Sequence, residues 1–204
     1  LGRRVRKQET HAAVAAAAAM LAAAVSVGRV LVLVAVTAAV VLPEAGPALA
    51  AALLAFVAGA FGLRFFDPEQ AKGDSGQSVK SPLDLVSVAQ FAVFLGAVII
   101  VGRLVADEFG QAGLLPFAAT AGLADVDAVA LAAGSLVRGG LDAASGAHAV
   151  LVAVLMNTLA KGVIGGVAGG WLYAGYYFLA ALGAALTAAA VWWLATPLLA
   201  PLFG

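Results

Sequence analysis

Apolar segments long enough to cross a lipid bilayer dominate this sequence. The hydrocarbon core of a bilayer is about 30 Å thick, and a helix needs roughly 20 apolar residues to cross it. Backbone polar groups cannot be left unpaired in lipid, so segments of this kind are helical. The fold class predicted is therefore all-α, a polytopic membrane protein. We expect about six transmembrane helices, near Ala12–Leu42, Ala48–Phe66, Leu83–Val105, Gly113–Val137, Ala147–Val167 and Leu172–Leu194.

The low charge of the chain limits its partners. Of 204 residues, 64% are hydrophobic and 11% are charged, whereas about 25% of the residues in a soluble domain are charged. Lysine plus arginine equals aspartate plus glutamate, at 11 each, and nucleic-acid binding requires a basic surface. The chain has no cysteine and two histidines, which argues against disulfides and the usual zinc site. We expect the lipid bilayer as a partner, no nucleic acid and no resident cofactor.

The predicted organisation is a single membrane domain, 1–204, with a basic lead (1–11), a first three-helix half (12–105) and a second three-helix half (106–204). Six crossings would place both termini on one side of the membrane. The opposite side would then hold only Arg103, with Arg29 and Lys161 left inside spans. The terminal side would have most of the others, namely Arg3, Arg4, Arg6, Lys7, Arg64, Lys72, Lys80 and Arg138. The positive-inside rule therefore predicts that both termini are cytoplasmic.

The first and fourth predicted spans are both interrupted near their centres by polar residues. Ser26–Arg29 interrupts the first, and Gly122–Asp127 interrupts the fourth. Each of these spans is followed by two uninterrupted ones, and three spans per half would make the halves inverted in the membrane. Discontinuous helices at corresponding positions of inverted halves are typical of transporter binding sites. We therefore consider a 3+3 inverted repeat with broken helices one and four, although 22–34 and 120–132 match poorly residue by residue.

Asp125 and Asp127 are the most informative residues, because carboxylates deep in a membrane are costly and rare. In one interpretation Asp125 caps a second half-helix that begins after a break near Gly122. In the other, the two acids bind a transported divalent cation or proton, and they are then the candidate metal ligands. Thr120 and Asn157 could supply further oxygen ligands. A cap alone would not require two carboxylates.

Two cations inside predicted spans are the expected counter-charges of the acidic pair. Asn157 and Lys161 are four residues apart, which places them on one face of a helix. Lys161 is expected to contact Asp125 or Asp127 inside the bundle, since a lysine in lipid is unfavourable. Arg29 is expected to be the second counter-charge. These contacts could be static pairs that fix helix register, or counter-charges that an arriving cation or proton displaces.

Three short elements carry a resemblance to a known family. They are Phe109–Leu114 (FGQAGL), Gly122–Ala128 (GLADVDA) and Asn157–Lys161 (NTLAK). The sequence resembles an uncharacterised bacterial membrane domain of unknown function, which often forms the C-terminal part of MgtC/SapB-family proteins. The resemblance implies an inner-membrane protein, a loose association with magnesium or metal homeostasis, and a fused or associated MgtC-type domain. Such a domain would precede this chain, which begins at Leu1 rather than Met.

The function that we expect is a secondary transporter, or half of one, for a cation or protons. The alternative is a membrane scaffold or regulatory module that transports nothing and acts with an MgtC-type domain. We expect no enzyme activity, since the sequence has neither a nucleophile–histidine–acid set nor a nucleotide-binding glycine loop. A homo-oligomer is compatible with either function. The expected site comprises Asp125, Asp127, Asn157 and Thr120 as ligands, with Lys161 and Arg29 as counter-charges.

Overall fold

The computed structural model describes residues 2–65 and 85–203, and these residues are almost entirely helical. The predicted all-α class is therefore confirmed for this part of the chain. The elements are α1 (Gly2–Thr37), a 3-10 helix η1 (Ala39–Val41), α2 (Leu42–Phe65), α3 (Leu85–Ala124), α4 (Val126–Arg138) and α5 (Ala143–Phe203).

Three helical stretches within the described residues are long and apolar enough to cross a membrane. They are Ala12–Thr37, Ala39–Leu63 and Ala143–Leu194. This finding supports a membrane-associated chain. The third predicted span, Leu83–Val105, begins outside the described residues.

Two of the helices are divided by a glycine in a conformation that other residues rarely adopt. Gly110 has φ 56° and ψ −143° inside α3, and Gly170 has φ 82° and ψ 175° inside α5. Glycine has no Cβ and reaches positive φ without a steric penalty. The chain therefore changes direction at both positions, and each helix consists of two arms. We call 85–109 and 111–124 the first and second arms of α3, and 143–169 and 171–203 the first and second arms of α5.

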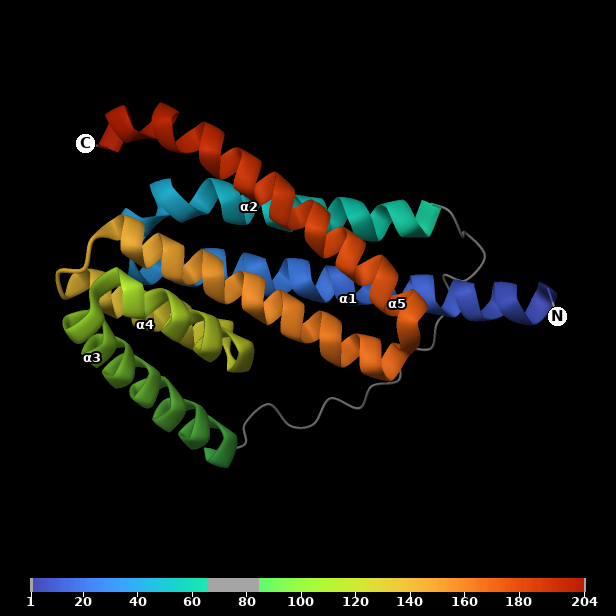
Figure 1. Ribbon diagram of the computed structural model, residues 1–204, viewed down its shortest axis with the longest axis horizontal. Coiled ribbons are helices and arrows are strands. Elements are labelled where there is room, and N and C mark those ends of the chain that lie inside the picture. Colours follow the sequence, from blue (N-terminus) through green and yellow to red (C-terminus); the bar gives the residue numbers. More distant parts are fainter. Residues whose placement is uncertain (1, 66–84, 204) are drawn as a thin grey trace.

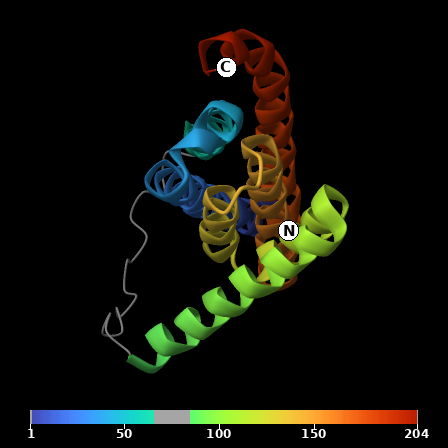
Figure 2. The ribbon, with the colours of Figure 1, turned by 90° about the vertical axis from the view of Figure 1, so that its left-hand side faces the viewer.

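α1, α2 and both arms of α5 run along the long axis of the molecule and form its main bundle (Figure 1). Met20, Leu49, Phe56 and Tyr177 are among the largest fully buried side chains between these helices. The bundle core also contains many alanines, and small residues allow helices in a membrane to pack closely. Figure 2 shows that the first arm of α3 lies on the opposite side of the bundle from α2.

The second arm of α3 and α4 lie side by side and form an antiparallel helical hairpin. A Cβ placed on Gly102, in the first arm of α3, would lie within 4 Å of Phe117 in the second arm and of Leu136 in α4. Ala128 and Ala132 of α4 also pack in one cluster with Phe117 and Ala121. Asp125 is the residue between the arms, and it therefore lies at the tip of the hairpin.

The hairpin corrects our expectation for the fourth span. The break predicted near Asp125 is present, but Gly113–Val137 does not cross the bundle as one helix. The 13 residues of α4 extend about 20 Å, which is less than the thickness of a hydrocarbon core. The segment enters from one end of the bundle, reverses at Asp125 and returns to the same end (Figure 1). A count of apolar residues cannot distinguish such a helical hairpin from a single long helix.

The break predicted in the first span is wrong. α1 is helical without interruption from Gly2 to Thr37, including Ser26–Arg29. One glycine costs a helix only about 1 kcal/mol, and Gly28 faces α2, where its Cβ would lie 3.2 Å from Leu53. The inverted repeat remains a prediction. One of the two helix breaks on which it was based is absent, because α1 is continuous. The two chain ends lie at opposite ends of the bundle (Figure 1), unlike the arrangement expected for six crossings.

The connections at the base of the hairpin are closed by side-chain contacts. The Arg138 guanidinium, at the end of α4, donates a hydrogen bond to the carbonyl oxygen of Thr37 at the end of α1. The Asp142 carboxylate accepts a hydrogen bond from the backbone N–H of Ser145, at 2.8 Å, in the first turn of α5. Hydrogen bonds from the side chain and backbone of Ser145 hold the pKa of Asp142 below its ordinary value. The first contact joins α4 to α1, and the second caps the start of α5.

Replacing Gly122 by alanine tests how closely the hairpin packs on α5. The added Cβ would lie 2.6 Å from Cα of Ala153, so we expect Gly122→Ala to destabilise the folded state by about 1–3 kcal/mol. Gly96→Ala, in the first arm of α3, is the matched control, because nothing lies within 4 Å of its Cβ position. It should be neutral or stabilise the helix by about 0.5–1 kcal/mol. Thermal unfolding in detergent measures the stability of both variants. Equal destabilisation by Gly122→Ala and Gly96→Ala would contradict the close contact between Gly122 and Ala153.

Candidate functional site

Asp125 forms the N-cap of α4 at the tip of the hairpin. Its backbone is extended, with φ −155° and ψ 115°. Its side-chain Oδ1 accepts hydrogen bonds from the backbone N–H groups of Asp127, at 2.8 Å, and Ala128, at 3.4 Å. The backbone N–H of Asp125 itself donates to the carbonyl oxygen of Ala121, at 2.9 Å. The capping interpretation of Asp125 therefore matches the structure, and two backbone donors in the first turn of α4 are satisfied.

Asp127 pairs with Arg29 of α1. The distance from Arg29 Nη2 to Asp127 Oδ2 is 2.6 Å. The Asp127 side chain is 14% exposed, whereas the Arg29 side chain is 61% exposed. Asp127 Oδ1 is buried and has no hydrogen-bond partner among the described residues. The carboxylate thus has one oxygen bound to a cation and one oxygen free to accept a proton or another ligand.

Lys161 of α5 contacts a hydroxyl rather than a carboxylate. Its Nζ donates a hydrogen bond to Ser26 Oγ of α1, at 2.9 Å. The expected ion pair between Lys161 and Asp125 or Asp127 is not formed within the part of the chain that the structure describes. Ser26 and Arg29 are three residues apart and share one face of α1, which brings both cations to the same side of the hairpin tip. The sequence predicted Ser26 to be part of a helix break, and it did not predict the contact of Ser26 with Lys161.

The two neutral ligands expected from the sequence have different positions. Asn157 Nδ2 donates a hydrogen bond to the carbonyl oxygen of Gly122, at 3.2 Å. This carbonyl lies in the last turn of the second arm of α3, where helical acceptors lack an intrahelical partner. Thr120 is exposed, and its hydroxyl donates to Pro116 and Phe117 carbonyl oxygens of its own helix. Asn157 therefore belongs to the hairpin tip, and Thr120 does not contact the acidic pair.

A small cavity lies next to these polar contacts. It has a volume of about 10 Å³ and is bordered by Ser26, Val126, Asn157 and Lys161, among others. A space of this size is at the lower limit for one water molecule. Three of the four side chains named here are polar, so a water there would have hydrogen-bond partners. The cavity connects the Lys161–Ser26 contact with the first residue of α4.

The oxygen ligands at the tip are few for a divalent cation. No group of three or more acids, histidines or cysteines that could hold a metal occurs within the described residues. Calcium takes six to eight oxygen ligands, and magnesium requires near-octahedral coordination. One oxygen of Asp125 is engaged as the helix cap and one oxygen of Asp127 is paired with Arg29. In this conformation the tip fits a proton or a weakly held monovalent cation better than a divalent one.

Several residues at and beside the hairpin tip are exposed. Arg29 and Lys161 are exposed, as are Thr120 and Leu123 beside the tip. Ser26 lies 11 residues before the end of α1, which corresponds to about 16 Å along the helix. Arg29 and Lys161 lie within the long apolar stretches Ala12–Thr37 and Ala143–Leu194, where contact of a charge with lipid would be unfavourable.

Asp125→Ala is expected to destabilise the hairpin by about 1 kcal/mol, the usual effect of losing an N-cap. Asp125→Asn should keep most of this stability, since asparagine caps helices about as well as aspartate. Thermal unfolding of both variants in the same detergent measures the difference. If Asp125→Asn destabilised the chain as much as Asp125→Ala, the negative charge rather than the cap would be what Asp125 contributes.

Comparison with known proteins identifies a family. No curated protein and no solved structure matches the chain. The family model described as "Domain of unknown function (DUF4010)" matches residues 1–169, which include α1 to α4 and the first arm of α5. This match confirms the resemblance to a domain of unknown function, while the association with MgtC/SapB proteins stays a prediction. The chain belongs to the DUF4010 family.

Proposed function

We propose that this chain is a secondary transporter of the bacterial inner membrane, with the hairpin tip as its binding site and a proton as the ion that it moves. In a second form of this proposal, the chain moves a monovalent cation in place of the proton. The observation that carries it is the Asp127 carboxylate, which lies at the tip of a re-entrant hairpin with one oxygen paired to Arg29 and the other unpaired.

The architecture of the tip supports a transport role. Transporter sites are commonly formed where discontinuous helices end inside the membrane, because the helix ends there supply unpaired backbone groups and dipoles. Here α4 begins and the second arm of α3 ends at the same place. α1 contributes Arg29 and Ser26, and α5 contributes Asn157 and Lys161. Movement of the hairpin relative to these helices would change the Arg29–Asp127 and Asn157–Gly122 contacts together.

The exposure of the cations supports a water-filled approach to the tip. Arg29 and Lys161 are at a depth where lipid contact is unfavourable, and Arg29 is 61% exposed. The other side of the tip is packed, with Leu114, Ala118 and Val129 buried along the hairpin arms. We therefore propose access from one end of the bundle only, as alternating access requires in each of its states.

The proposed cycle uses Arg29 as a displaceable counter-charge. When Asp127 is ionised it holds Arg29, and α1 is tied to α4. Protonation of Asp127 at its free oxygen, or binding of a cation there, removes the charge that attracts Arg29. The hairpin is then free to move relative to α1, which would close the first access route and open the second. Asp125 keeps the start of α4 intact throughout, because its cap does not involve Arg29.

The second candidate function is a scaffold or regulatory module that acts with an MgtC-type domain or as a homo-oligomer. The direct contact of 2.6 Å between Arg29 and Asp127 favours it, since a static ion pair of this kind fixes helix register. In that case the exposed cations would face the partner protein instead of water. Ion flux distinguishes the two functions.

Flux through the purified chain in liposomes is the decisive test. We expect wild type to carry protons along an imposed gradient, with rates followed by an entrapped pH dye. Asp127→Asn should lower the rate by more than about tenfold, which corresponds to about 1.4 kcal/mol. Asp107→Asn is the control, because Asp107 is an exposed carboxylate near Gly110, away from the tip. No wild-type flux under proton, sodium or potassium gradients would contradict transport and favour the scaffold.

Cysteine labelling tests the approach to the tip. The chain has no cysteine, so single-cysteine variants need no prior substitutions. A membrane-impermeant thiol reagent should modify Thr120→Cys from one side of the membrane and leave Ala118→Cys unmodified, since Thr120 is exposed and Ala118 is fully buried. Equal protection of both cysteines in intact vesicles would exclude a water-filled route to the tip.

A further inference from the structure

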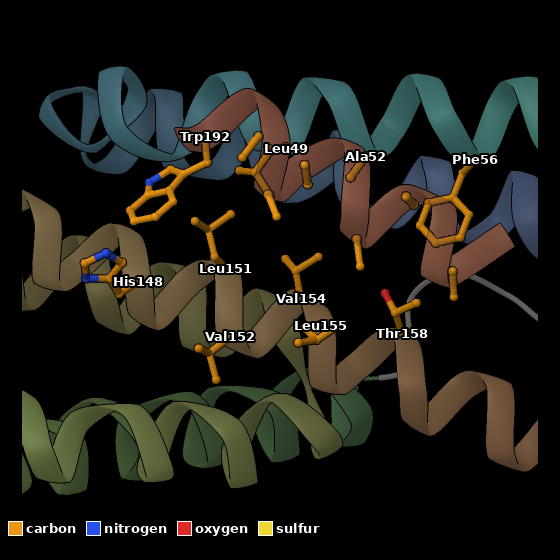
Figure 3. Close-up of a pocket in the computed structure, with 16 residues that line it drawn as sticks. Leu49, Ala52, Phe56, His148, Leu151, Val152, Val154, Leu155, Thr158 and Trp192 are labelled. Atoms are coloured by element: carbon orange, nitrogen blue, oxygen red, sulfur yellow. The ribbon is translucent and has the colours of Figure 1, made fainter. Parts of the chain in front are cut away.

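A second and larger cavity lies between α2 and the two arms of α5 (Figure 3). Its volume is about 270 Å³. Its lining is almost wholly apolar: α2 contributes Leu49, Ala52 and Phe56, and the first arm of α5 contributes Leu151 and Val154, among others. The charged residues of the hairpin tip do not line it. A site of this composition recognises hydrocarbon.

The second arm of α5 creates this space with a row of alanines. Ala181, Ala184 and Ala188 face the cavity, whereas Leu182 and Leu186 of the same helix are 56% and 61% exposed on its outer side. Small residues usually allow two membrane helices to approach closely. Here the helices remain apart and leave room for a ligand.

The length and depth of the cavity correspond to one leaflet of a bilayer. Figure 3 shows His148 and Trp192 at one end and Phe56 and Thr158 at the other. His148 and Thr158 are ten residues apart on α5, which is about 15 Å along the helix. This is half the thickness of a hydrocarbon core of about 30 Å. We call the end at His148 and Trp192 the outer end of the cavity. It lies one to two turns from the start of α5 at Ala143.

The residues at the outer end suit the boundary between headgroups and acyl chains. The rings of His148 and Trp192 meet edge to face, with centroids 5.5 Å apart. Tryptophan is enriched at this boundary in membrane proteins, because its ring has an apolar body and a polar N–H. The outer end is thus amphipathic and the rest of the cavity is apolar.

The cavity is continuous with the outer surface of the bundle. Leu155 and Ala189 line it, and both are exposed, Leu155 at 44%. At this depth in a membrane the outer surface contacts lipid tails, and an apolar cavity does not fill with water. We propose that the cavity binds one acyl chain of a membrane phospholipid, drawn from the leaflet in which α5 begins, with the headgroup beside His148 and Trp192.

The acyl-chain site does not depend on the proposed transport function, although the two sites share a wall. Val154 and Thr158 line both this cavity and the small cavity beside Lys161. A bound acyl chain would therefore pack against the helix face that carries Asn157 and Lys161.

Lipid analysis of the purified full chain tests the proposal. After exhaustive exchange into detergent, wild type should retain about one phospholipid per chain by mass spectrometry. The double variant Ala184→Leu/Ala188→Leu fills the cavity and should lose this lipid, with an unchanged or raised melting temperature. Ala190→Leu, on the exposed side of the same helix, is the matched control and should keep it. Retention by the double variant, or no retained lipid in wild type, would overturn the proposal.

Tryptophan quenching provides a second readout, in which the variant that reports binding keeps the cavity lining unchanged. The chain has three tryptophans, and Trp171 and Trp193 are 83% and 73% exposed. In Trp171→Phe/Trp193→Phe, where Trp192 remains, a phospholipid with brominated acyl chains should quench fluorescence in a saturable manner in detergent. In Trp171→Phe/Trp192→Phe, where Trp193 remains, quenching should rise without saturation. Parallel curves for the two variants would contradict a defined acyl-chain site.

Discussion

The reversal of the chain at Asp125 depends on the satisfaction of backbone hydrogen bonds away from bulk water. Two helix ends meet at this residue, and each brings polar groups that a membrane does not tolerate unpaired. The Asp125 carboxylate accepts from the start of α4, and the Asn157 amide donates to the end of the second arm of α3. Both contacts stabilise the hairpin at its tip. The positions of Asp127, Arg29 and Lys161 relative to one another follow from it.

Several parts of this arrangement were predictable from residue chemistry. Apolar length indicated a helical membrane chain, and the rarity of buried charge led to Asp125, Asp127, Lys161 and Arg29 as a set. The N-cap role of Asp125 followed from its place after a glycine in an apolar run. The structure places these residues, with Asn157, around one hairpin tip.

Other parts were decided by tertiary contacts that the sequence does not encode locally. After Asp125 the chain reverses, and α4 packs Ala128 and Ala132 in one cluster with Phe117 and Ala121, which apolar length alone cannot show. α1 stays continuous through Gly28, which lies against Leu53 of α2. Lys161 could have met either acid or a hydroxyl group, and the structure selects Ser26. Helix spacing places a residue on a face, but it does not identify its partner on another helix.

The continuity of α1 has a mechanical consequence. This helix of 36 residues is about 54 Å long, longer than the hydrocarbon core is thick. Arg29 lies toward one end of it, and the basic residues Arg3–Lys7 lie at the other. With no break in α1 to absorb a displacement, the helix would act as a stiff lever. A shift at Arg29 would then be transmitted to a surface far from the hairpin tip, where another molecule could sense it.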